Sequence, residues 1–307
     1  MRKLISLCII IIWGTSATAV ECVSSSSDGV STALNPMSGL NSCSVTPDAI
    51  EVKLFDLGVC TSAPSVNPDF TINYSSCVSL FSDSSGRSVT LSNGMQVSLN
   101  KEVALEETTY THGYIILGST FAIKTKFTFN YNVATEDNAL NPGPGKYCYT
   151  DGSSYDAGAP SNLTCSNDSG LPGYAASSES LLELFANYPG SGGTSNYYPN
   201  VTAVIDGINE TFDLFALDST KKIDATATYT PAQRPYMLGI QRLSSPMIVS
   251  ANTTNIDARI SLSNGVMLGF APNGSDTLNG DDFDCTNVGG CLVDALWTGL
   301  AFRFVAN

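Results

Sequence analysis

The sequence predicts an all-β fold: an antiparallel β-sandwich stapled by disulfides, with a loop-rich insertion that carries one short helix. Three observations lead to this prediction. Segments rich in Val, Ile, Thr, Phe and Tyr alternate between apolar and polar residues. Asn-Gly and Asp-Gly pairs, which are typical of tight hairpins, separate several of these segments. Eight cysteines follow the first 19 residues, which is typical of a disulfide framework in an exported chain.

The longest predicted strand lies within residues 111–133. It begins as an apolar run and then alternates, with Phe121, Ile123 and Phe127 on one face and lysines at 124 and 126 on the other. Residues 49–60 begin with the same alternation. This pattern predicts long strands with one face in the core and one face in water.

Two similar segments, "VTLSNGMQVSL" (89–99) and "ISLSNGVMLGF" (260–270), each centre on an Asn-Gly pair. Asn-Gly suits a hairpin turn that needs positive φ at both central residues. The flanking residues differ, and the surrounding segments do not align. The sequence therefore predicts the same hairpin turn formed twice, not a duplicated domain. A third hairpin is predicted at Asp206-Gly207.

Residues 1–19 are predicted to be a cleavable signal peptide. Arg2 and Lys3 precede a short apolar run, and Ala17 and Ala19 give the small-x-small pattern that signal peptidases cut. The apolar run is shorter than the about 20 residues that span a bilayer, and we expect no membrane span elsewhere in the chain. The predicted location is therefore secreted: periplasmic, extracellular or at a cell surface.

The remaining chain is predicted to have two parts. Residues 20–47 form a Ser/Asn/Gly-rich N-terminal segment, and residues 48–307 form a single sandwich domain. Residues 135–197 are a loop-rich insertion in this domain, because they contain many Gly, Pro, Ser, Asn and Asp residues. Within the insertion, "SSESLLELFANY" (177–188) predicts the short helix, with Ser178 as its N-cap.

The chain is strongly acidic. It has 14 Lys+Arg and 28 Asp+Glu, which gives a net charge of −14. Without Arg2 and Lys3 the balance is 12 against 28, or −16. Nucleic-acid binding needs Lys and Arg to neutralise phosphates, so a nucleic-acid partner is not expected.

Four pairs of neighbouring cysteines are predicted to form disulfides. Sequence alone leaves other connectivities open, because eight cysteines can pair in many ways. Zinc ligation is disfavoured, since the chain has no C-x-x-C and a single histidine. The predicted pairs are Cys22–Cys43, Cys60–Cys77, Cys148–Cys165 and Cys285–Cys291.

Two short motifs resemble a known group of proteins. Val59-Cys60-Thr61 ends an early strand, and "TTYTH" (108–112) precedes the long strand. This arrangement resembles secreted β-rich proteins of marine bacteria. The resemblance implies an exported, single-domain β protein that is not embedded in a membrane, and it implies no particular activity and no functional residue.

A group of tyrosines in or beside the insertion is a candidate ligand-binding surface, because tyrosine is rigid and common at recognition surfaces. The alternative is that these rings pack the insertion against the rest of the domain. The candidate residues are Tyr147, Tyr149, Tyr155, Tyr174, Tyr197 and Tyr198.

The acidic loop "NGSDTLNGDDFDC" is a candidate calcium site. Calcium takes six to eight oxygen ligands at flexible geometry, which a Gly-containing acidic loop can supply. The spacing differs from that of an EF-hand, and a solvated acidic loop is the alternative. The candidate ligands are Asp276, Asn279, Asp281, Asp282 and Asp284.

These observations favour an exported non-enzymatic protein that acts in binding, adhesion or assembly, by self-association or with a glycan or protein ligand. The alternative is a secreted hydrolase that uses His112 or carboxylates of the insertion, such as Asp151, Asp156, Glu179 and Glu183. No G-x-S-x-G motif accompanies His112, and a histidine bonded to backbone near a strand end is the simpler explanation for it.

Overall fold

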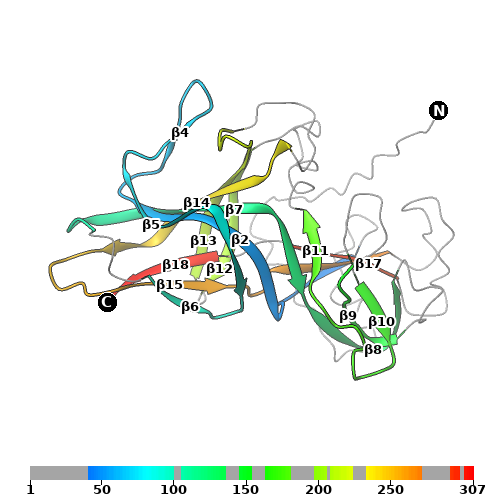
Figure 1. Cartoon of the computed structure of the whole chain (residues 1–307). Coiled ribbons are helices and arrows are strands. Elements are labelled where there is room, and N and C mark those ends of the chain that lie inside the picture. Colours follow the sequence, from blue (N-terminus) through cyan, green and yellow to red (C-terminus); the bar gives the residue numbers. More distant parts are fainter. Residues whose placement is uncertain are drawn as a thin grey trace, which may run out of the picture. The chain divides into compact units, whose positions relative to one another are not determined.

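The structure is a computed structural model of the whole chain (Figure 1). It describes residues 41–99, 105–135, 145–153, 163–180, 197–205, 208–223, 233–271, 291–297 and 301–307. Nearly all of these residues lie in β-strands or in the turns between them, and no α-helix occurs among them. The predicted all-β fold is therefore confirmed.

The chain divides into two compact units, each assembled from three separate segments. The first unit combines Met1–Asp48, Ile123–Glu179 and Asn264–Thr298, and the second combines Ala49–Ala122, Ser180–Ser263 and Gly299–Asn307. The prediction of a single sandwich domain over residues 48–307 stays a prediction.

The first unit contains one sheet. Its strands pair antiparallel, except for a short parallel contact between Cys291–Leu292 and Ala134–Thr135. The strands, in their order across the sheet, are β1 (Asn41–Val45), β16 (Val266–Ala271), β17 (Cys291–Trp297), β8 (Lys126–Thr135), β9 (Gly145–Thr150) and β10 (Leu163–Ser166).

The second unit contains a large antiparallel sheet, a three-stranded sheet and a short two-stranded ribbon. The large sheet has the order β12 (Tyr197–Ile205), β13 (Ile208–Leu217), β14 (Tyr236–Ile248), β7 (Thr109–Lys124), β2 (Ala49–Cys60) and β5 (Cys77–Leu91). The three-stranded sheet has the order β18 (Ala301–Ala306), β15 (Ile256–Ser261) and β6 (Gln96–Leu99). The ribbon pairs β3 (Ser65–Val66) with β4 (Ile72–Asn73).

The two larger sheets of the second unit pack face to face through aromatic side chains. The ring of Phe302 on β18 lies 5.9 Å from that of Phe212 on β13 and 5.5 Å from that of Phe304. A Cβ atom on Gly113 would lie 2.6 Å from the Phe304 ring, so this position of β7 needs glycine. Interdigitation of this kind between two sheets is the packing of a β-sandwich.

The opposite face of the large sheet carries a second apolar cluster. Its buried members come from four strands and from the turn after β13, and Ile72 and Tyr74 of the ribbon pack against them. The cluster contains Phe55, Cys60, Tyr114, Ile116, Phe215, Leu217, Ile223, Leu238 and Ile240. The ribbon is thus attached to the sheet by its second strand and the residues after it.

Two of the four predicted disulfides are present among the described residues. Cys60 bonds to Cys77, and Cys148 bonds to Cys165. In each case the two cysteines are direct cross-strand partners. The predicted pairs Cys22–Cys43 and Cys285–Cys291 each contain at least one residue outside the described ranges.

The predicted helix at 177–188 begins as a strand instead. β11 (Ser177–Ser180) occupies its first four residues, and the remaining eight lie outside the described part of the chain. The Ser177 hydroxyl accepts a hydrogen bond from Gly152 N (3.1 Å), and Ser178 N donates to Ser153 O (3.1 Å). These long-range bonds replace the predicted N-cap. Together with β9 and β10, β11 also shows that the described parts of the insertion 135–197 contain strands.

The two Asn-Gly turns are not hairpins, which corrects the prediction made from their sequence. The first leads from β5 in the large sheet to β6 in the three-stranded sheet, and the second leads from β15 to β16, which lie in different sheets. Positive φ falls on Gly94 (74°) in the first turn but on Asn264 (54°) in the second. By contrast, β12 and β13 pair directly, with Ile205 opposite Ile208, which confirms the hairpin predicted at Asp206-Gly207.

Candidate interaction surface

The segment between Cys60 and Cys77, here called the ribbon loop (61–76), leaves the end of β2 and returns into β5. Its base is closed by the disulfide and by two hydrogen bonds, from Thr61 N to Ser76 O (2.9 Å) and from Ser76 Oγ to Ser62 O (3.0 Å). Figure 1 shows it as the blue-to-cyan loop around β4 that extends away from the strands beside it. A loop closed in this way has few conformations available to it.

The tip of the ribbon loop is a compact turn that holds Phe70 in a left-handed conformation. Asn67 N donates to Thr71 O, and Phe70 N donates to Asn67 O, both at 2.9 Å. Asp69 Oδ1 accepts the Thr71 hydroxyl at 2.6 Å, and the hydrogen bonds from Thr71 lower the pKa of Asp69 below its ordinary value. Phe70 has φ of 64°, which is rare for a bulky residue and costs about 1–2 kcal/mol.

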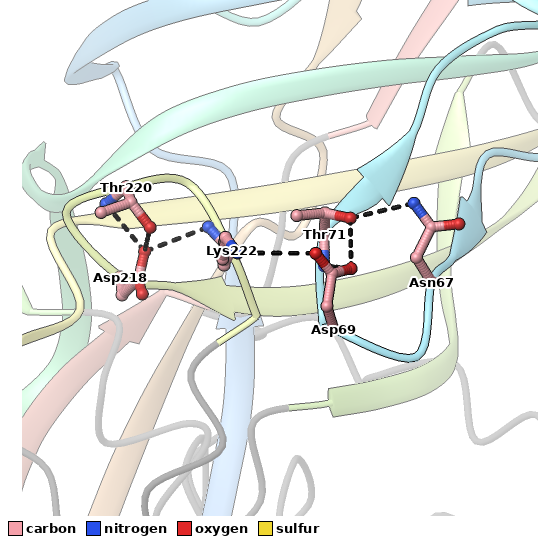
Figure 2. Close-up of polar contacts among 6 residues, drawn as sticks. All are labelled: Asn67, Asp69, Thr71, Asp218, Thr220 and Lys222. Carbon is pink, nitrogen blue, oxygen red and sulfur yellow. Dashed lines mark hydrogen bonds and ion pairs between the residues drawn. The ribbon is translucent and has the colours of Figure 1, made fainter.

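A second turn, which follows β13, holds this tip from the side. Asp218 Oδ1 accepts hydrogen bonds from Thr220 N and Thr220 Oγ1, each at 2.7 Å, and from Lys222 N at 3.0 Å. Lys222 Nζ then lies 3.6 Å from Asp69 Oδ2, which links the two turns as shown in Figure 2. Ile223 N also donates to the Phe70 carbonyl at 3.0 Å.

The ribbon loop exposes apolar side chains although it is held firmly. Phe70 and Val66 are each 46% exposed, and they are two of the three large hydrophobic residues that stand out of the described surface. The third, Ile248, belongs to β14. An exposed aromatic ring on a pre-ordered turn is typical of a contact residue, because little conformational entropy is lost when it binds.

Below the ribbon loop, a polar group is built into the apolar cluster. Asp56 Oδ1 accepts the hydroxyls of Tyr114 and Ser79, both at 2.8 Å. The Tyr74 ring lies 4.9 Å from that of Tyr114, and its hydroxyl is buried with no hydrogen-bond partner among the described residues. Burial and then the Asp56 carboxylate raise the pKa of both tyrosines, so they stay neutral and anchor the ribbon loop to the sheet.

His112, the candidate catalytic base, is arranged unfavourably for activating its neighbour. Its Nδ1 lies 2.9 Å from Thr111 Oγ1, and that hydroxyl donates to Thr61 O at 2.9 Å. Because the hydroxyl proton is used in this way, Nδ1 must donate its own proton to Thr111 Oγ1. His112 therefore cannot accept a proton from this hydroxyl, and its Nε2 carries the free lone pair.

The candidate tyrosine surface is spread over both units. Tyr149 is fully buried on β9, and its hydroxyl donates to Pro172 O at 2.9 Å. Tyr174 donates to Asp48, with Lys124 Nζ 4.7 Å from its ring centre. Tyr147 lies half-buried on β9. Tyr197 and Tyr198 belong to β12 in the second unit, and their side chains lie outside the described part of the chain. Tyr155 lies entirely outside the described residues. The ligand-binding role of the six tyrosines stays a prediction.

Among the candidate carboxylates of the insertion, Asp151 is the one whose side chain is described. Burial opposes its ionisation, but hydrogen bonds from Thr164 Oγ1 (2.6 Å) and Ser153 N (3.0 Å) outweigh this effect and lower its pKa. Such a carboxylate stays ionised and is a poor general acid. Asp156 and Glu183 lie outside the described residues, and Glu179 is placed only as part of β11.

The predicted calcium ligands 276–284 all lie outside the described ranges, so the calcium site stays a prediction. Within those ranges, no group of three or more His, Cys, Asp or Glu side chains is placed to hold a metal ion. No helix in the described part is both long and apolar enough to cross a membrane.

Sequence reasoning missed the ribbon loop as a site, although it noted the two cysteines that close it. The available signal was the sequence Asp69-Phe70-Thr71, in which an Asp followed two residues later by Thr favours a side-chain-capped turn. It also missed Arg242, a basic residue that interrupts the apolar strand "YMLGIQRL".

Comparisons with known proteins place the chain in no family. No family model, no curated protein and no solved structure matches it. The resemblance to secreted proteins of marine bacteria stays a prediction.

Proposed function

We propose that this is an exported, non-enzymatic protein that binds a partner through the ribbon loop, in adhesion or assembly. The observation that carries the proposal is Phe70, an exposed aromatic residue held in an unfavourable backbone conformation by contacts on both sides. Strain that surrounding structure maintains at an exposed residue is typical of functional sites. A purely structural turn would gain stability from Gly or Asn at this position.

Export is supported by two independent features. The first 19 residues have the organisation of a signal peptide. The two described disulfides suit an oxidising compartment, such as the periplasm or the cell exterior. Disulfide closure also suits a binding loop, because the loop must keep its shape outside the cell without help from a large core.

The proposed partner is a second copy of this chain or a glycan, and one set of variants tests both. Residues 20–307 are produced with intact disulfides and measured by light scattering over a range of concentrations and on a glycan array. Phe70→Ser and Val66→Ser should each weaken the association or binding at least tenfold, because aromatic and apolar anchors dominate such contacts.

Ile248→Ser is the matched control, since Ile248 is 67% exposed but lies on β14 outside the ribbon loop. It should leave association and binding unchanged. A protein that stays monomeric and binds no glycan, or one for which Ile248→Ser and Phe70→Ser have equal effects, contradicts the proposal.

A further inference from the structure

Three polar residues form a row across the large sheet of the second unit, on the face that also carries the apolar cluster under the ribbon loop. Arg242 on β14 is directly opposite His112 on β7 on one side and Thr211 on β13 on the other. Directly opposed residues of neighbouring strands point to the same face, with their Cβ atoms about 5 Å apart. Asp213, two residues after Thr211, points to that face as well.

Arg242 is exposed and unpaired in this row. The ion pairs Lys126–Asp48 and Lys222–Asp69 do not involve Arg242. This is notable in a chain with 28 Asp+Glu and 14 Lys+Arg, where carboxylates are abundant. The guanidinium therefore has its planar set of N–H donors available to an external group.

His112 and Asp213 offer hydrogen-bond acceptors next to this donor. His112 gives its Nδ1 proton to Thr111 Oγ1, so its Nε2 is an acceptor when the ring is neutral. Asp213 Oδ1 accepts Asn200 N at 3.0 Å, and the carboxylate retains further acceptor capacity. The charge of Arg242 lowers the pKa of His112 and the charge of Asp213 raises it, which agrees with both groups lying near the His112 ring.

An irregularity in β14 fixes one end of the row. The register passes from Arg242 opposite His112 to Met247 opposite Tyr110, so residues 243–246 bulge out opposite Thr111. The bulge is tied down by the buried Glu210, whose carboxylate accepts Ser244 N at 3.0 Å and Ser244 Oγ at 2.6 Å. Bulges of this kind commonly re-aim side chains next to binding sites.

We infer that this row is a binding site for a carboxylate flanked by hydroxyl groups, as in a uronic acid sugar. The Arg242 guanidinium forms paired hydrogen bonds with the carboxylate of the sugar. One hydroxyl of the sugar donates to His112 Nε2, and another donates to the Asp213 carboxylate. A neutral sugar lacks the group that Arg242 recognises. A sulfate ion lacks hydroxyl donors for the two acceptors.

The acidic chain as a whole opposes an anionic ligand at long range. At physiological ionic strength, exposed charges more than about 8 Å away are largely screened, so the local contacts with Arg242 decide the binding. The inferred site lies on the same face of the large sheet as the apolar cluster under the ribbon loop. It uses Arg242, His112 and Asp213 in place of the exposed Phe70 and Val66, and it goes beyond the proposed function.

The single histidine makes the test direct. The chain contains one His, so its ring proton resonances in a proton NMR spectrum belong to His112 without further assignment. Galacturonate is added to residues 20–307 at pH 7.5, with galactose, acetate and sulfate as separate comparison ligands. We expect a saturable displacement of the His112 resonances with galacturonate, and displacement at least tenfold weaker with the other three.

Variants then locate the contact. Arg242→Gln should weaken galacturonate binding at least tenfold, whereas Arg303→Gln, on the three-stranded sheet, should not change it. If Arg242→Gln fails to fold, Arg242→Lys keeps the charge but loses the planar fork, and it should also weaken binding. Phe70→Ser should leave this binding unchanged, which separates it from the ribbon loop.

The inference is overturned if galacturonate does not displace the His112 resonances, or if acetate or sulfate displaces them as strongly. It is also overturned if a folded Arg242→Gln or Arg242→Lys variant binds galacturonate like the wild type, or if Arg303→Gln weakens binding equally.

Discussion

The two described disulfides close loops of equal length in different settings. Cys60–Cys77 and Cys148–Cys165 each join residues 17 apart in sequence, and each joins direct cross-strand partners. The first closes the ribbon loop at the end of two long paired strands, β2 and β5. The second joins β9 to β10, a strand of four residues.

The surroundings of the two disulfides differ in what they present to solvent. The first bounds a loop with exposed Val66 and Phe70. The second lies beside Tyr149, which is fully buried, and both of its cysteines are buried. Two disulfides of equal sequence separation therefore border an exposed loop in one place and part of the buried core in the other, and the neighbouring residues decide which.

The largest difference should appear when each disulfide is removed. Loop closure alone predicts about 3 kcal/mol for either disulfide, because the loops are equally long. We expect Cys148→Ala/Cys165→Ala to lose about 4 kcal/mol, since both sulfurs are buried and their loss leaves a cavity, and Cys60→Ala/Cys77→Ala to lose about 2 kcal/mol. Urea unfolding of both double variants measures this, and equal losses would refute the distinction between the two settings.

The next largest effect concerns the tyrosines beside the second disulfide. Tyr149→Phe should destabilise the protein by about 1–2 kcal/mol, because it leaves Pro172 O without its buried donor. Tyr174→Phe should have a smaller effect, since the Tyr174 hydroxyl and Asp48 are exposed to water. Thermal unfolding of the two variants gives the comparison, and a larger loss for Tyr174→Phe would contradict it.

At the tip of the ribbon loop, stability and binding should change in opposite directions. Phe70→Gly removes a side chain from a residue with φ of 64° and should stabilise the fold by about 0.5–1 kcal/mol. The same variant should lose binding, because it removes the exposed ring. Denaturation and binding measured on one preparation would test both effects, and a destabilised Phe70→Gly would show that the ring supports the fold.

The smallest effect concerns His112, whose neighbour Thr111 bonds to the base of the ribbon loop. Burial and then the charge of Arg242 lower the pKa of His112 below its ordinary value of about 6.5, and Asp213 partly opposes this. His112 therefore binds a proton more readily in the unfolded chain than in the folded protein. Its contribution to the stability of the folded protein is present above pH 6.5 or so, and it is lost as the pH falls from about 6.5 through the lower pKa of the folded state.

NMR titration of the single histidine checks this sign. Arg242→Gln should raise the pKa of His112, and Asp213→Asn should lower it further. A wild-type pKa above 6.5 would show that Asp213 has the stronger influence.

Local sequence signals predicted the features that depend on neighbouring residues. The pairs Cys60–Cys77 and Cys148–Cys165, and the turn between Ile205 and Ile208, follow from short spacings and were correct. The two Asn-Gly turns were predicted as hairpins, and this was wrong, because their local residues carry no information about which sheet the next strand joins. That choice depends on pairing with distant segments, as when Gln96 of β6 pairs with Arg259 of β15.

The candidate sites were harder to predict for the same reason. The row of Arg242 and His112 exists because β14 and β7 pair in one register, across more than 120 residues of sequence. The Phe70 contacts depend on a turn at Asp218–Lys222 that is equally distant in sequence. A one-residue shift in the β14–β7 register would point Arg242 to the other face of the sheet.

The position of β18 has a consequence for the order in which the chain acquires its structure. Phe302 and Phe304 occupy the space against Gly113 and Phe212, which precede them by long stretches of sequence. This part of the core therefore cannot close before β18 has joined strands that precede it far back in the chain. Pairing between such distant segments is usually slow. A chain shortened by residues 301–307 should fail to develop the near-ultraviolet circular dichroism of the complete protein.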